Sequence, residues 1–115
     1  MRVLMVEPGK APRAAEIGTG LKSMQSVVGG RIQAVYPFED PVALVCSDQG
    51  KLSGLPPNRA LRMPETGEVY DVICGTFFLC AAPADSDSFE SLSEEQLKRY
   101  ADFFRRPEFF RGVGR

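Results

Sequence analysis

Residues 31–80 read RIQAVYPFEDPVALVCSDQGKLSGLPPNRALRMPETGEVYDVICGTFFLC. Short apolar runs alternate in this stretch with proline, glycine, asparagine and aspartate, which is typical of strands joined by turns. Residues 32–36 and 42–46 predict two strands, and the five-residue link between them suits a hairpin loop. A turn at residues 48–50 then leads into a third predicted strand at 51–55. Because these links are too short for a parallel crossover, we expect an antiparallel meander.

Further strands complete the predicted sheet. Residues 69–80 form a nearly continuous apolar run, which predicts a strand covered on both faces and therefore central in the sheet. Residues 60–63 and residues 3–7 predict two short strands. The polar segment from 10 to 20 has no clear pattern, and we expect it to be irregular.

Two stretches have the spacing of amphipathic helices. The first, over 21–28, places apolar residues at i, i+3 and i+7, and the two glycines that follow would end it. The second, over 94–105, opens with a capping box at 93–96 and carries an apolar face. Its last turn would contain Arg105 and Arg106, which favour the negative end of the helix dipole.

The length of the chain and its charge narrow the class of protein. A chain of 115 residues fits one globular domain spanning residues 1–115. The patterns predict an α+β fold, in which a single antiparallel sheet of about five strands has two helices packed on it. The 14 basic and 15 acidic residues leave a net charge of −1. A nucleic-acid-binding domain would more often carry a basic excess, so we do not expect nucleic acid as a partner.

The apolar runs and the cysteines indicate the cellular location of the protein. No window approaches the roughly 18 apolar residues of a membrane span, so we expect no membrane partner. The four apolar residues at 3–6 are too few for the core of a signal peptide. Three cysteines, an odd number, favour free thiols in a reducing compartment. We therefore expect a cytoplasmic protein.

The sequence lacks the common motifs of catalysis and metal binding. It contains no histidine, which is the commonest general base and metal ligand. Cys46, Cys74 and Cys80 are 28 and 6 residues apart, unlike the close pairs of a zinc site. Each lies in or beside an apolar run, where cysteine packs as a small hydrophobic residue. We expect no metal, no cofactor and no catalytic activity.

Asn58 and Arg59 are the leading candidates for ligand binding. They follow two prolines, which would hold them in place at a low entropic cost. Asparagine offers both a donor and an acceptor, and the guanidinium group matches phosphate or carboxylate. The alternative is structural: Asn58 would cap a turn, and Arg59 would pair with a carboxylate such as Glu68 or Asp71.

Tyr36 and Asp40 form a second candidate group, together with Glu39. The adjacent carboxylates lie in a predicted loop, where they could contact a ligand, bind a cation or act as acid and base. The alternative is that they form the turn itself, with Asp40 accepting backbone hydrogen bonds ahead of Pro41.

Aromatic residues without a predicted place in the core indicate a partner surface. Phe103 falls off the apolar face of the second helix, and Phe38 lies in the loop before Asp40, so we expect both on such a surface. Basic and aromatic residues alternate near the C-terminus and could grip single-stranded nucleic acid by stacking, but acidic neighbours offset most of the basic charge. We expect Phe109 and Phe110 to fold back onto the core.

Three segments of the chain carry a family resemblance: VYPFEDPVALVC, GKLSGLPPNRAL and GTFF. With a VEPGK opening, they resemble a numbered domain-of-unknown-function family of small bacterial proteins, common in gut clostridia, phages and conjugative elements. The likeness covers residues 1–110, and the chain departs from the pattern at residues 47–49, where relatives often have asparagine and acidic residues. The resemblance implies no activity, because the family has no established one.

These observations predict a small accessory or regulatory protein, possessing no catalytic activity, that acts by binding a protein partner. An origin on a phage or another mobile element follows from the resemblance alone. The alternative is a binding protein for a small nucleotide-like or anionic ligand, held by the segment 56–62. A third hypothesis is an enzyme that uses Glu39 and Asp40 with Tyr36 nearby.

Overall fold

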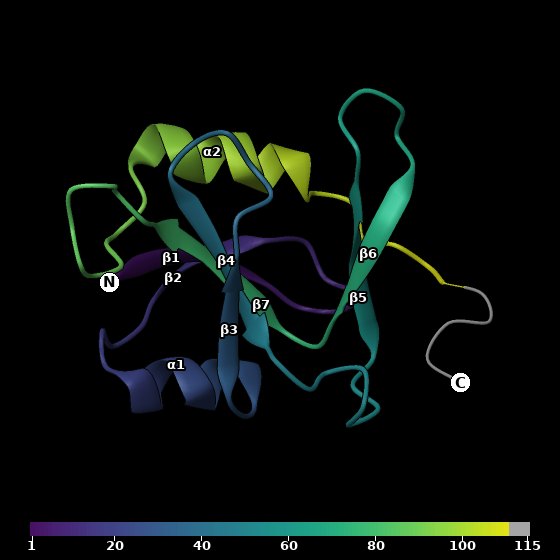
Figure 1. Ribbon diagram of the computed structural model, residues 1–115, viewed down its shortest axis with the longest axis horizontal. Coiled ribbons are helices and arrows are strands. Elements are labelled where there is room, and N and C mark those ends of the chain that lie inside the picture. Colours follow the sequence, from purple (N-terminus) through teal and green to yellow (C-terminus); the bar gives the residue numbers. More distant parts are fainter. Residues whose placement is uncertain (111–115) are drawn as a thin grey trace.

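The computed structural model describes residues 1–110 and contains two antiparallel sheets and two helices, which confirms the α+β class (Figure 1). The main sheet has five strands. In spatial order they are β2 (Arg13–Glu16), β1 (Arg2–Val6), β7 (Phe77–Ala81), β4 (Val42–Ser47) and β3 (Ile32–Val35). Every pairing between neighbours is antiparallel, as the short links predict.

The helices α1 (Leu21–Val28) and α2 (Glu94–Phe103) lie on opposite faces of the main sheet (Figure 1). α1 ends at Gly29, whose φ of +83° is left-handed and whose N–H donates to the carbonyl of Gln25. α2 has the predicted capping box but ends two residues early, so the prediction that Arg105 and Arg106 lie in its last turn is wrong. Neither helix is long and apolar enough to cross a membrane.

The core is centred on β7, whose five residues are all buried. Leu79 lies opposite both Leu4 of β1 and Leu44 of β4. Because successive side chains of a strand point to opposite faces, Phe77 and Leu79 pack toward α2, whereas Phe78 and Cys80 pack toward α1. The prediction of a central strand covered on both faces is therefore confirmed for this part of the apolar run.

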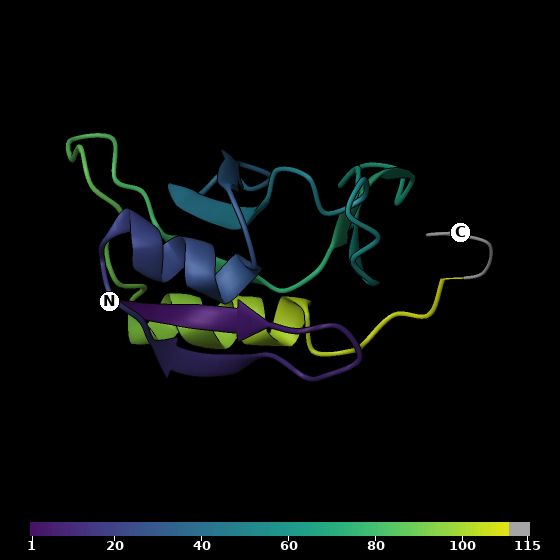
Figure 2. The same cartoon turned by 90° about the horizontal axis from the view of Figure 1, so that it is seen from below.

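A second sheet corrects the prediction of a single one. β5 (Pro57–Arg62) and β6 (Val69–Cys74) pair only with each other among the described residues, and we call this hairpin, residues 57–74, the arm. The arm stands at the end of the molecule opposite the N-terminus, beyond both helices (Figures 1 and 2). The predicted strand 69–80 is thus two strands. Gly75, with a left-handed φ of +85°, turns the chain from the arm into the main sheet.

Three local predictions are also wrong. Residues 51–55 form a turn instead of a strand, because the N–H groups of Ser53 and Leu55 donate to the carbonyls of Gln49 and Gly50 just before it. β2 lies where we expected irregular structure, and its mostly exposed residues explain why no apolar pattern marked it. Phe109 does not pack on the core: it is 96% exposed, while Phe110 is half-buried.

Candidate functional site

A groove with a volume of about 660 Å³ opens where the end of α2, the β3–β4 loop and the arm meet. Five aromatic side chains line it, together with the apolar side chains of Leu61 and Met63. We call it the aromatic groove. The five aromatic residues are Phe38, Tyr70, Tyr100, Phe103 and Phe104.

Phe38 organises the aromatic wall of the groove. Its ring centroid lies 4.6 Å from that of Tyr100, 5.5 Å from that of Phe103 and 6.1 Å from that of Phe104. The last two contacts are edge-to-face, an arrangement that aromatic rings prefer. Tyr100 and Phe104 are buried in the core, whereas Phe103 keeps 64% of its surface exposed. The wall is therefore anchored in the core and open toward solvent at Phe103.

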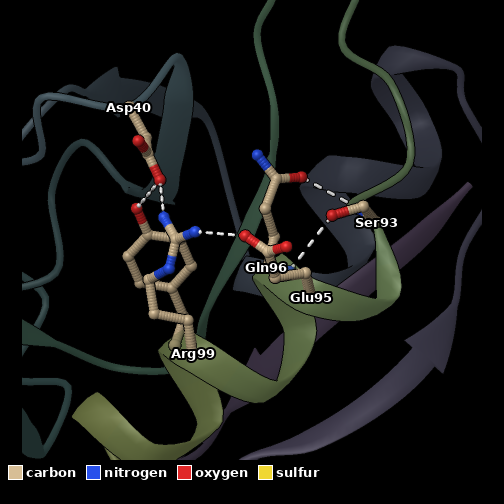
Figure 3. A network of polar contacts seen from close by, with 6 residues as sticks. Asp40, Ser93, Glu95, Gln96 and Arg99 are labelled. Atoms are coloured by element: carbon tan, nitrogen blue, oxygen red, sulfur yellow. Dashed lines mark hydrogen bonds and ion pairs between the residues drawn. The ribbon is translucent and has the colours of Figure 1, made fainter.

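Asp40 forms the polar wall of the groove with α2 (Figure 3). Its Oδ2 accepts hydrogen bonds from Arg99 and, at 2.9 Å, from the hydroxyl group of Tyr100. Arg99 also donates to Glu95 at 2.7 Å. Burial and then the hydrogen bond to Asp40 raise the pKa of Tyr100, and the charge of Asp40 raises the pKa of Arg99. This network fastens the β3–β4 loop to α2 and leaves Asp40 already partnered.

A second carboxylate, that of Glu108, closes the groove on the side of the arm. Its Oε2 accepts from the backbone N–H of Ala60 at 3.1 Å, and its Oε1 lies 3.1 Å from Nη1 of Arg62. The Glu108 side chain is only 23% exposed, while that of Arg62 is 50% exposed. Ala60 and Arg62 belong to β5, so Glu108 occupies the edge of β5 that faces away from β6.

Asn58 and Arg59 lie behind the groove, both fully buried. Asn58 Nδ2 donates to the carbonyls of Val6 and Gly75, each at 2.9 Å. Arg59 donates to the carbonyl of Phe104 and, at 2.7 Å, to that of Lys10. Burial lowers the pKa of Arg59, and the negative charge of Glu108 opposes that shift.

These contacts differ from the structural alternative drawn from the sequence. Arg59 forms no ion pair with Glu68 or Asp71, and Asp71 instead pairs with Lys51 at 2.5 Å. Binding of an anion by Arg59 stays a prediction, and it would require the ligand to replace the backbone carbonyls that now surround the guanidinium group.

The structure thus brings some of the candidate residues together and separates others. Asp40, Phe38 and Phe103 share the aromatic groove. Tyr36 is 61% exposed and is not part of the lining. Glu39 lines the groove but is exposed, so the two loop carboxylates have different surroundings.

Sequence reasoning missed the contributions of the arm and of the C-terminal segment. Tyr70 and Met63 come from the arm, which the sequence did not indicate as a separate hairpin. Arg62 belongs to the candidate segment 56–62, but its role depends on Glu108, 46 positions later in the chain. No local spacing could have connected these two residues.

A second cavity, of about 310 Å³, lies between β6, the end of β4 and the turn after β4, and Cys46 and Cys74 line it. All three cysteines are buried free thiols, which confirms their predicted place in the core. Burial raises the pKa of each, that of Cys80 to about 12. Within residues 1–110 no three cysteine, aspartate or glutamate side chains come together as a metal site.

Comparison with known proteins gives one match. A family model described as a domain of unknown function (DUF3846) matches residues 1–105, which include all of the main sheet, the arm and both helices. No curated protein matches the chain. No solved structure matches it either.

Proposed function

The chain belongs to the DUF3846 family, a domain of unknown function, and from that premise we propose that it is a binding protein without catalytic activity. Its partner is a protein, and the aromatic groove is the surface that receives this partner. The protein is then an accessory or regulatory factor, which acts through the partner protein that it binds.

The observation that carries this proposal is the exposure of aromatic side chains around a hollow surface. Phe103 is 64% exposed and Tyr70 is 53% exposed, and both line the aromatic groove. Partner-binding surfaces are enriched in aromatic residues, whose large side chains lose little conformational entropy when they are buried. Phe103 belongs to α2, which packs on the core, and Tyr70 belongs to the arm, so the two residues stand on opposite sides of the groove.

The test compares proteins retained by the wild type with those retained by Phe103→Ser. Phe109→Ser is the matched control, because Phe109 is 96% exposed and does not line the groove. We expect one set of partner proteins on the wild type and on F109S, identified by mass spectrometry from the native host, and its loss on F103S. Equal retention by F103S, or no retention above background, would contradict the proposal.

A small anionic ligand is the second candidate, and one observation favours it. The volume of about 660 Å³ lies within the range of small-molecule sites, and Arg62, from the segment 56–62, contributes a cation to the lining. Thermal unfolding with a panel of nucleotides tests this idea, since a ligand at 100 times its Kd adds about 2.7 kcal/mol to the stability. An unchanged midpoint with every nucleotide would exclude this class of ligand.

The compartment and the origin of the protein are part of the same proposal. Three free, buried thiols are consistent with a reducing compartment, which supports a cytoplasmic location. The resemblance to proteins of phages and conjugative elements supports an origin on a mobile element. Location of a tagged copy in cell fractions checks the first of these statements.

A further inference from the structure

We propose that the partner enters the aromatic groove with a peptide segment in which a carboxylate side chain stands next to an aromatic or large aliphatic residue. In the free protein, Glu108 occupies the place of that carboxylate. The proposal rests on the proposed function, since it names the chemistry by which the groove recognises a protein partner.

The proposed carboxylate site begins at the edge of β5 that faces the groove. The arm has two strands, and no other strand in residues 1–110 pairs with the side of β5 that faces the groove. The N–H of Ala60 points from this edge, and its acceptor is the carboxylate of Glu108, 48 residues away. Residues 58–61 of β5 are buried and Arg62 is exposed, so an extended peptide would reach this edge at its Arg62 end. Unpaired strand edges favour such pairing with extended backbone over binding of a compact small molecule.

The second step is the geometry around that carboxylate. One oxygen of Glu108 accepts from the Ala60 N–H at 3.1 Å, and the other lies 3.1 Å from Nη1 of Arg62. A guanidinium group and a backbone N–H that hold the two oxygens of one carboxylate form a site selective for that group. Arg62 is half exposed, so a carboxylate arriving from solvent can reach it.

The third step is the position of Glu108 in residues 107–110, which form neither helix nor strand. It lies beyond the end of α2 at Phe103, and the adjacent Phe109 is 96% exposed. Its side chain holds this segment against β5 through Ala60 and Arg62. Because the segment belongs to neither sheet, displacement of the Glu108 carboxylate by another one breaks no strand pairing.

The fourth step is the apolar surface within reach of the carboxylate site. Phe38 and Phe103 line the same groove as Ala60 and Arg62, and Phe103 presents most of its surface to solvent. A ligand whose carboxylate replaces Glu108 would place a neighbouring apolar side chain against these two rings. The positive charge of Arg62 selects a negatively charged group on the ligand. The rings of Phe38 and Phe103 select the apolar side chain beside it.

Exchange of this kind makes Glu108 an internal competitor. A group on the same chain acts at an effective concentration in the millimolar range, so it weakens the apparent affinity for any external carboxylate. Removing the Glu108 side chain should tighten peptide binding by about tenfold, the equivalent of one charge-assisted hydrogen bond. Removing Arg62 in the same variant should reverse most of this gain.

The experiment uses a blocked Gly-Glu-Trp-Gly peptide and its counterpart with glutamine in place of glutamate. Because the chain contains no tryptophan, the fluorescence of the peptide reports binding without a background signal. The proteins are the full chain, Glu108→Ala, Glu108→Ala with Arg62→Ala, and the control Glu65→Ala. Glu65 is an exposed carboxylate of the arm that does not line the groove. Far-ultraviolet circular dichroism verifies that each variant is folded.

We expect E108A to bind the glutamate peptide about tenfold more tightly than the wild type does, and the glutamine peptide about tenfold more weakly than the glutamate peptide. E65A should bind as the wild type does. Equal affinities for the two peptides, or no gain in E108A, would overturn the assignment. So would self-association of E108A in sedimentation, because the occupant would then be a second copy of this chain.

The outcome separates this inference from the function on which it rests. If F103S loses its partner proteins while E108A gains no affinity for the glutamate peptide, the groove still binds a protein. The proposal that a carboxylate of the partner replaces that of Glu108 is then wrong. If F103S retains all proteins and neither peptide binds to any variant, both statements are wrong.

Discussion

Arg59 is a buried cation that has no carboxylate of residues 1–110 at hydrogen-bonding distance, and backbone carbonyls accept its hydrogen bonds instead. The carbonyl of Phe104 lies just beyond the end of α2, where the helix dipole is negative, so the guanidinium group there gains from both the hydrogen bond and the dipole. Asn58 adds contacts to the end of β1 and to Gly75. Two consecutive residues of β5 thereby join the arm to the rest of the molecule.

Replacement of Arg59 should therefore destabilise the protein strongly. Arg59→Met leaves the carbonyls of Lys10 and Phe104 without their donors, and we expect the free energy of unfolding to fall by about 2–4 kcal/mol in urea denaturation. Arg59→Lys, which keeps one donor group, should lose less. Arg62→Met is the control, because Arg62 is half exposed and should change the stability by about 0.5 kcal/mol or less. Similar stabilities of R59M and R62M would contradict this role.

The buried thiols make the stability sensitive to alkaline pH. Burial raises the pKa of Cys80 from 9.0 to about 12, so the folded protein keeps a proton that the unfolded chain releases. This contribution is complete below pH 9 and is lost as the pH rises toward 12, at up to about 1.4 kcal/mol per pH unit for one group. Cys46, Cys74 and Tyr100 have raised pKa values and act in the same direction.

Urea denaturation at pH 7, 9 and 10 measures this effect. We expect the free energy of unfolding to fall between pH 9 and pH 10, and to fall less steeply in Cys80→Ala, which has one titrating group fewer. The comparison uses the slope against pH, because the smaller side chain also leaves a cavity that lowers the stability at every pH. Equal slopes for the two proteins would show that Cys80 titrates normally in the folded state.

At the scale of elements, the two connections between the arm and the main sheet each depend on a glycine. The chain enters through a turn at residues 50–55 and leaves at Gly75. Gly50 lies against the backbone of β6: a Cβ atom at this position would stand 2.7 Å from the carbonyl oxygen of Cys74. The absence of a side chain at Gly50 thus permits the turn to pack on the end of the arm.

Gly50→Ala should consequently destabilise the protein, because a backbone carbonyl cannot move aside as the end of a flexible side chain can. We expect a loss of about 1–3 kcal/mol, the usual effect of overpacking. Gly30→Ala is the matched control, since a Cβ there would meet no atom within 4 Å. Thermal unfolding of both variants provides the measurement, and a G50A midpoint equal to that of G30A would contradict the close contact.

The helices and most of the main sheet could be predicted from local pattern, whereas the arm could not. The capping box at Ser93 and the glycines after α1 are signals within a few residues, and both helices begin and end near the predicted positions. The split of the apolar run at Gly75 has no such signal, because a glycine within a strand also fits a bulge. Residues 69–74 pair with β5, whereas residues 77–81 pair with β1 and β4, and contacts between residues far apart in the sequence determine these pairings.

The candidate site shows the same division between local and distant information. Helix spacing and loop position predict Phe38, Asp40 and Phe103 as candidates, and the fold brings them into one groove. The hydrogen-bonding groups of Asn58 and Arg59 indicate a ligand site, but in the structure they donate to backbone carbonyls of the same protein. The role of Glu108 depends on the edge of β5, which exists only in the folded chain.

At the scale of the whole molecule, the stability should be distributed unevenly. β7 has paired strands on both sides and both of its faces are covered, whereas β2 and β3 are the edges of the main sheet and the arm contains only two strands. Opening the arm or an edge strand breaks fewer contacts than opening the centre.

Amide hydrogen exchange followed by NMR measures this distribution. We expect the slowest exchange at the paired amides of β7, β1 and β4, and exchange at least about tenfold faster at those of β5 and β6, a difference of about 1.4 kcal/mol in opening free energy. Equal protection of the arm and of β7 would mean that the two sheets open as one cooperative unit, with Asn58 and Arg59 coupling them fully.

The position of β7 has a consequence for synthesis on the ribosome. β1 and β4 leave the ribosome first, but neither pairs with the other, and both wait for residues 77–81. Until then the nascent chain contains separate pairs of strands, and the face that α2 later covers is open, because α2 follows β7 in the chain. Isolated hairpins are marginally stable in water. The chain therefore emerges more than half complete before its central strand exists, and during this interval the unpaired edges of β1 and β4 are open to aggregation.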